Sequence, residues 1–177
     1  FQLVGAMNPC PCGHRGDPRG RCRCTPDQVL RYRGRLSGPL LDRIDLVIEV
    51  PVPPPEALAL GADVSPPNES AEVRVRVAVA RDRACARQGT LNARLDAAGV
   101  ARYCAPVPAA HALLAKAVTR LGLSARAFHR VAKVARTIAD LAGEENIGFA
   151  HMAEAIGCRR ADALRESDGT TTPFART

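Results

Sequence analysis

A proline-rich segment divides this chain into two parts with different sequence patterns. Residues 51–55 read Pro-Val-Pro-Pro-Pro, and a run rich in Gly, Pro, Ser and Asn continues to about Asn68. Because proline fixes φ and has no backbone N–H, such a run continues neither a helix nor a central strand. We therefore expect a linker at residues 53–68 between a domain at 1–52 and a domain at 69–165.

The part before the linker has the pattern of an α/β structure. Apolar runs of strand length occupy Phe1–Met7 and Leu46–Val50. Between them, Thr25 is followed by a proline and then by Gln28, which gives a capping hydroxyl, a proline at the first helical position and a reciprocal amide. These signals predict a helix over Pro26–Arg35.

The part after the linker is predicted to be entirely helical. Apolar residues recur three and four positions apart in five segments: Glu69–Gln88, Asn92–Tyr103, Ala109–Leu121, Ser124–Ala142 and Gly148–Cys158. In the fourth segment the predicted core stripe is Phe128, Val131, Ala135, Ile138 and Leu141 or Ala142. The polar tail at 166–177 is expected to be disordered. The predicted fold class is α/β followed by all-α.

The composition favours a folded protein with polyanionic partners. The 177 residues carry a formal net charge of +7. No apolar stretch reaches the roughly 18 residues of a membrane span, and the N-terminus lacks a signal-peptide pattern, so we expect a cytoplasmic protein without a membrane partner. Because the chain begins at Phe1 inside a strand-like run, we also expect it to start within a larger protein.

Four cysteines lie within fifteen residues and form the first candidate site. They are arranged as two Cys-x-Cys pairs: Cys10, Cys12, Cys22 and Cys24. Four thiolates satisfy a tetrahedral zinc ion, and a loop too short to have its own core gains folding energy from the metal. Two disulfides or free thiols are the alternatives, and His14 is a substitute ligand. The other three cysteines lie in helical patterns and receive no role.

An arginine-rich patch surrounds the cysteine loop and is the second candidate site. Its members are Arg15, Arg19, Arg21, Arg23, Arg31, Arg33 and Arg35, opposed by Asp17 and Asp27. Such a patch would bind DNA through its phosphates, and we expect Arg31, Arg33 and Arg35 to make these contacts. The alternative is a solvated face whose charge partly balances four metal-bound thiolates.

Three isolated polar residues form the third candidate. Asn8 ends the first strand-like run, Arg43 lies between two aspartates, and Arg126 follows Ser124 at a predicted helix start. A cation near a helix N-terminus is unfavourable unless an anion such as phosphate binds there. Each residue also has a structural explanation: Asn8 as a cap, Arg43 as an ion-pair partner, and Arg126 as a solvated side chain.

Three longer strings connect these residues to a known family. Residues 7–13 (Met-Asn-Pro-Cys-Pro-Cys-Gly), 36–45 (Leu-Ser-Gly-Pro-Leu-Leu-Asp-Arg-Ile-Asp) and 123–130 (Leu-Ser-Ala-Arg-Ala-Phe-His-Arg), with 134–142 after them, resemble the magnesium-chelatase-like AAA+ ATPases of the ComM/YifB family. The resemblance runs from Phe1 to about Arg160. It implies a homohexamer that uses ATP and Mg²⁺ and acts on DNA as a helicase-type motor in branch migration, natural transformation and recombination.

The resemblance also assigns roles to the three polar residues. Asn8 matches sensor 1, Arg43 matches the arginine finger that reaches a neighbouring subunit's nucleotide, and Arg126 matches sensor 2 in a helical lid. The fold it implies is the C-terminal part of a AAA+ P-loop NTPase core plus that lid.

The chain departs from the family pattern at the nucleotide-binding motifs. It has no Gly-x-x-x-x-Gly-Lys-Ser/Thr loop and no acidic magnesium-binding strand end, the Walker A and B motifs. We therefore expect ATP and Mg²⁺ to be held mainly by a preceding half, and this chain alone to be inactive. The alternatives are a magnesium chelatase motor subunit, against which the cysteine loop argues, and a stand-alone zinc-dependent DNA-binding or structural module.

Overall fold

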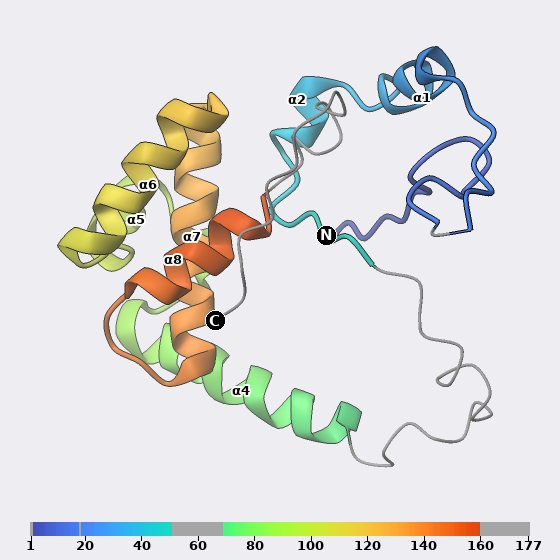
Figure 1. Ribbon diagram of the computed structural model, residues 1–177. Coiled ribbons are helices and arrows are strands. Elements are labelled where there is room, and N and C mark those ends of the chain that lie inside the picture. The colour runs from blue at the N-terminus through green and yellow to red at the C-terminus, as the bar shows by residue number, and fades with distance from the viewer. Residues whose placement is uncertain (1, 18, 51–68, 160–177) are drawn as a thin grey trace. The chain divides into compact units, whose positions relative to one another are not determined.

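The computed structural model describes residues 2–17, 19–50 and 69–159, which form two compact units (Figure 1). Among the described residues, the first unit comprises those up to Leu41 and the second comprises those from Asp42 onward. Residues 42–50, assigned from the sequence to the first domain, thus group with the helical part. The predicted linker at 53–68 and the predicted tail at 166–177 lie outside the described residues.

The first unit contains two short helices joined by loops. Helix α1 spans Pro26–Arg33, and its N-terminus has the predicted capping box, in which Thr25 and Gln28 exchange hydrogen bonds of 3.3 and 3.0 Å. The predicted helix is therefore confirmed, although it ends two residues earlier. Helix α2, Gly38–Leu41, was not predicted.

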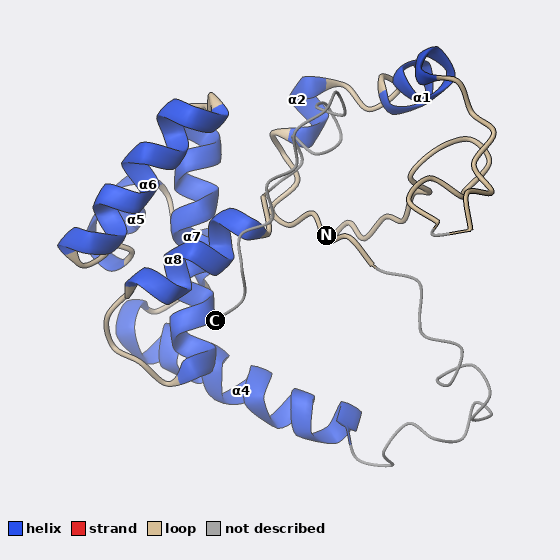
Figure 2. Ribbon diagram, in the orientation of Figure 1, coloured by secondary structure: helices blue, strands red, loops and turns tan. Residues whose placement is uncertain are grey.

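The two predicted strands are not formed as strands among the described residues (Figure 2). Residues 2–7 and 46–50 are loop, and the β-pairing in the described chain is a single bridge between Pro106 and Ile147. A strand is stabilised by hydrogen bonds to a neighbouring strand, and neither segment has such a neighbour in the part of the chain that the structure describes. The structure therefore shows the helical part of the predicted fold class and not its α/β part.

The second unit is a helical domain whose elements follow the predicted segments closely. They are α4 (Glu69–Gln88), the 3₁₀ turn η1 (Asn92–Arg94), α5 (Ala97–Tyr103), α6 (Pro108–Leu121), α7 (Ala125–Ala142) and α8 (Phe149–Gly157). One predicted helix is split, because the Asp96 carboxylate accepts a hydrogen bond of 2.8 Å from the Gly99 N–H and starts a new helix. No described helix is both long and apolar enough to cross a bilayer.

Helix α7 provides much of the core of the helical domain. Its buried face combines Val131 with Ala127, Ala132, Ala135 and Ala139, and the small alanines let neighbouring helices approach closely. The predicted stripe is confirmed at Val131 and Ala135, while Phe128 and Ile138 pack against the core from partly buried positions. It is wrong at its end, where Leu141 and Ala142 are exposed.

The Asp140 carboxylate is the centre of a buried network of ion pairs and hydrogen bonds in this domain. Both oxygens of the Asp140 carboxylate accept from Arg87, at 2.6 and 2.9 Å, and Asn92 and Arg136 donate to it at 2.8 and 3.1 Å. Arg136 also donates to the carbonyls of Glu144 and Glu145, at 2.7 and 2.5 Å. Burial alone would raise the pKa of Asp140, but the hydrogen bonds from Arg87 and Asn92 lower it.

We expect Asp140→Ala to destabilise the helical domain strongly. Removing the carboxylate leaves two guanidinium groups without their shared counter-charge, so the loss in unfolding free energy should be about 3–5 kcal/mol. Urea unfolding followed by helical circular dichroism measures it. The matched control is Asp82→Ala at an exposed site on α4, which should change stability by about 0.5 kcal/mol or less.

The lowered pKa of Asp140 predicts how the stability of the helical domain changes with pH. Because the folded-state pKa of Asp140 is below the ordinary value of 3.8, the unfolded chain takes up this proton first as pH falls. The stabilisation from Asp140 is therefore present above pH 3.8 and is lost on acidification below it. A stability difference between wild type and Asp140→Ala that is unchanged down to pH 2 would contradict this assignment.

Candidate functional site

The cysteine loop is closed by a tight turn that brings the first two thiols together. The Gly13 N–H donates to the Cys10 carbonyl at 3.0 Å, and Gly13 has a φ of +79°, a conformation that glycine adopts without strain. Cys10 is fully buried, whereas Cys12 is exposed. The second pair, Cys22 and Cys24, leads directly into the capped start of α1.

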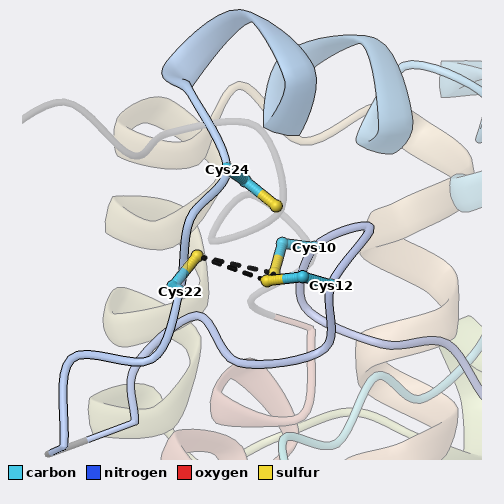
Figure 3. A group of neighbouring side chains, drawn as sticks. All are labelled: Cys10, Cys12, Cys22 and Cys24. Carbon is cyan, nitrogen blue, oxygen red and sulfur yellow. Dashed lines mark hydrogen bonds between the residues drawn. The ribbon is translucent and has the colours of Figure 1, made fainter.

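The four sulfur atoms converge on one point (Figure 3). The Sγ atoms of Cys10 and Cys12 lie 3.4 Å apart, and each lies 3.7 Å from that of Cys22. All four Sγ atoms, that of Cys24 included, lie within 4.8 Å of one another. A tetrahedral zinc ion with Zn–S bonds of about 2.3 Å separates its sulfurs by about 3.8 Å. The spacing fits a four-thiolate metal site and is too long for disulfide bonds of about 2.05 Å.

Backbone hydrogen bonds to the sulfurs also suit thiolate ligands. The N–H groups of His14 and Arg23 lower the pKa of the Cys12 thiol to about 6. The other sulfurs each accept a backbone hydrogen bond too, from Arg15 to Cys10, from Cys24 to Cys22 and from Cys12 to Cys24, and each of these bonds lowers the pKa of its thiol. The pKa of Cys10 is lowered, whereas burial and the neighbouring thiols raise the pKa of Cys22 and that of Cys24. Such backbone hydrogen bonds stabilise the deprotonated form, which is the form that ligates metal. The convergent donor set is the four cysteines and does not include His14.

The first unit has little apolar core to stabilise it without a cross-link. Among its described residues only Cys10, Val29 and Leu41 are buried. Units of about 40 residues usually need a disulfide, a metal or a partner surface, because they bury too small a share of their apolar area. A structural metal at the cysteines would supply that stabilisation.

The predicted DNA-contacting arginines differ in their surroundings. Arg31 and Arg35 are exposed, and Arg31 donates to the carbonyl of Asp27 in its own helix at 3.4 Å. Arg33 is half-buried and donates to the Pro9 carbonyl at 3.3 Å, so it ties α1 to the cysteine loop. Of the two predicted opposing acids, Asp17 pairs with Arg21. Arg31 and Arg35 are therefore better probes of a phosphate-binding face than Arg33.

The three predicted nucleotide-sensing residues all lie at exposed positions, in two different units. Asn8 precedes the Cys10 turn in the first unit. Arg43 follows α2 and groups with the helical domain, which also contains Arg126. Arg126 lies in the first turn of α7, where the Ser124 hydroxyl accepts from the Ala127 N–H at 3.2 Å as the N-cap.

Sequence reasoning missed two arginines that hold the Arg43 segment. Arg130, one turn beyond Arg126 on α7, forms an ion pair with Asp45. Arg159, just after α8, donates to the carbonyls of Ile44 and Asp42 at 2.7 and 3.3 Å. No local signal could have found these contacts, because helical periodicity describes only which face of a helix is apolar.

Family profiles match both units of the chain. The profile for magnesium chelatase subunit ChlI matches residues 1–58, and the profile for the C-terminal region of the same subunit matches residues 67–159, more than half of the chain. This chain belongs to the magnesium chelatase ChlI family. The family resemblance inferred from the sequence strings is therefore confirmed.

Individual relatives place the chain near YifB and ComM within that family. YifB of Escherichia coli K12 is 46% identical over 164 residues, covering 93% of this chain and 32% of YifB. Competence protein ComM of Haemophilus influenzae is 46% identical over 159 residues, covering 90% of this chain and 30% of ComM. Rv2897c of Mycobacterium tuberculosis is 39% identical over 170 residues, covering 93% and 32%. The chain spans about a third of the length of these curated relatives.

Proposed function

We propose that this chain is the C-terminal portion of a cytoplasmic AAA+ ATPase that assembles as a homohexamer and acts on DNA. The match of both units to one family, and the greater length of the relatives, support a larger protein whose preceding part holds ATP and Mg²⁺. The activity we propose is branch migration or unwinding of DNA in natural transformation and recombination. The name of ComM, a competence protein, supports that setting.

The proposal rests chiefly on the way the structure joins the segments of Arg43 and Arg126. These two exposed arginines flank the ion pair between Asp45 and Arg130, since Arg126 and Arg130 lie one helical turn apart. Two arginines from distant parts of the sequence thus belong to adjoining segments of one unit. Guanidinium groups suit polyphosphate, because they stay charged and donate in a fixed fork.

The proposed roles follow from the chemistry of each side chain. Asn8 as sensor 1 would orient the attacking water near the γ-phosphate, for which a neutral amide can both donate and accept. Arg43 as the arginine finger would stabilise charge that develops during phosphoryl transfer in a neighbouring subunit. Arg126 as sensor 2 would contact the γ-phosphate from a helix N-terminus, which itself favours anions. The four cysteines would hold a structural Zn²⁺ that shapes the loop carrying the arginine patch.

A magnesium chelatase motor subunit is the second candidate, because the family description names that enzyme. The convergent four-cysteine cluster also keeps open a zinc-dependent DNA-binding or structural module. Assays of the full-length protein separate the three. DNA-stimulated ATP hydrolysis supports the DNA motor, ATP-dependent metal insertion into a porphyrin supports the chelatase, and DNA binding without hydrolysis supports the module.

We expect DNA binding by the full-length protein to depend on Arg31 and Arg35. Replacing both by Glu should weaken binding by on the order of tenfold and reduce the slope of log affinity against log salt by about two, because each phosphate contact releases counterions. Fluorescence anisotropy between about 50 and 200 mM salt measures both quantities. The matched control is Arg74→Glu with Arg76→Glu, an equal change of charge at exposed positions on α4. Equal losses in the two double variants would mean that net charge, and not this patch, governs binding.

A further inference from the structure

Arg159 is a buried cation that donates hydrogen bonds to the backbone on both sides of Arg43. Its side chain is only 7% exposed, and its guanidinium donates to the carbonyls of Asp42 and Ile44, the two residues adjacent to Arg43. The Asp42 carboxylate lies 3.6 Å from the same guanidinium. A fork that binds two backbone carbonyls fixes the path of the chain between them, while Arg43 itself is exposed.

Two further contacts extend this attachment along the segment. The Val47 N–H donates to the Cys158 carbonyl at 2.7 Å, next to Arg159 in sequence. Arg130 on α7 pairs with Asp45. Residues 42–47 are therefore attached both to the end of α8 and to α7, the helix that begins beside Arg126. We call the contacts of residues 42–47 with Cys158, Arg159 and Arg130 the Arg159 clamp.

We propose that Arg159 is a positioning residue that makes Arg43 move with the helical domain. The proposal rests on the proposed function, in which Arg43 is the arginine finger and the helical domain is the lid. A change in lid position on nucleotide binding would then move the finger of the same subunit through the Arg159 clamp. The nucleotide state of one subunit is thereby passed to the pocket of its neighbour, where that finger acts.

Arg159→Ala in the full-length hexamer should lower kcat for ATP hydrolysis by about 10- to 100-fold and leave KM within about twofold. A finger displaced by about 1 Å loses much of its effect on the transition state, whereas substrate binding does not depend on it. Arg159→Lys should recover little, because a single ammonium cannot replace the fork between two carbonyls. The matched control, Arg120→Ala at an exposed site on α6, should hydrolyse ATP normally.

Two readouts separate positioning from general damage to the fold. Arg159→Ala with Arg43→Ala should be no slower than Arg43→Ala alone, because both substitutions remove the same interaction. Hydrogen exchange at the Val47 amide should accelerate in Arg159→Ala, while exchange at the Cys104 amide, which bonds to the Val100 carbonyl at 2.9 Å, should not change.

The outcomes also separate this inference from the function on which it rests. Normal hydrolysis by Arg43→Ala would remove the finger assignment, whatever Arg159→Ala does. A slow Arg43→Ala beside a normal Arg159→Ala, or losses that multiply in the double variant, would overturn the positioning role alone. Faster exchange at both amides would show that Arg159→Ala unfolds the domain and would likewise overturn it.

Discussion

Arg43→Ala in the full-length hexamer should reduce the rate of ATP turnover by about 10³-fold or more while ATP affinity stays nearly constant. An arginine finger acts on charge that appears during phosphoryl transfer, so its loss lowers kcat and leaves ground-state binding intact. Steady-state hydrolysis gives kcat, and binding of a fluorescent nucleotide gives the affinity. Arg126→Ala supplies the contrast, because a sensor that contacts the γ-phosphate should impair both nucleotide binding and the response of the lid.

Subunit mixing tests whether Arg43 acts between subunits. Arg43→Ala subunits are combined with subunits whose P-loop lysine, in the preceding part of the protein, has been replaced. Each parent is inactive, but some interfaces of the mixed hexamer pair an intact pocket with an intact Arg43, so partial hydrolysis should return. Normal turnover by Arg43→Ala alone would instead remove the arginine-finger assignment.

The purified chain should contain about one zinc ion, and the fold of residues 2–41 should depend on it. Structural zinc sites contribute on the order of 10 kcal/mol at neutral pH, far more than the three buried residues found in the described part of this unit can supply. Metal analysis gives the stoichiometry. After chelator treatment, trypsin should cut rapidly among the seven arginines between Arg15 and Arg35, while α4 to α8 keep their helical signal.

Cysteine variants test the same site without a chelator. Cys10→Ser should lose the metal and become as sensitive to trypsin as the chelated protein, because Cys10 is the fully buried ligand. The matched control is Cys85→Ser at an exposed position on α4, outside the cluster, which should keep the zinc. A metal-free wild-type chain that resists trypsin equally well before and after chelation would exclude a structural zinc site.

Local signals in the sequence were enough to place most of the helices and the cysteine cluster, although not α2. Thr25 with Gln28 marks the start of α1, and Ser124 marks the start of α7, because each cap is a hydrogen bond within four residues. The paired cysteines predicted a metal-binding loop for the same reason, since short spacing forces the thiols to be neighbours. The family could also be recognised from the sequence strings, and the profile matches confirmed it.

Contacts between distant residues were decided only by the tertiary structure. Arg159 and Ile44 are separated by 115 positions, and Arg87 and Asp140 by 53, so no periodicity relates them. The strands expected at residues 1–7 and 46–50 also depended on contacts that local sequence does not specify. An apolar run becomes a strand only when a neighbouring strand supplies its hydrogen bonds. Local sequence thus determined most of the helical segments and brought the thiols together, whereas packing across the chain determined which buried cation holds the backbone beside Arg43.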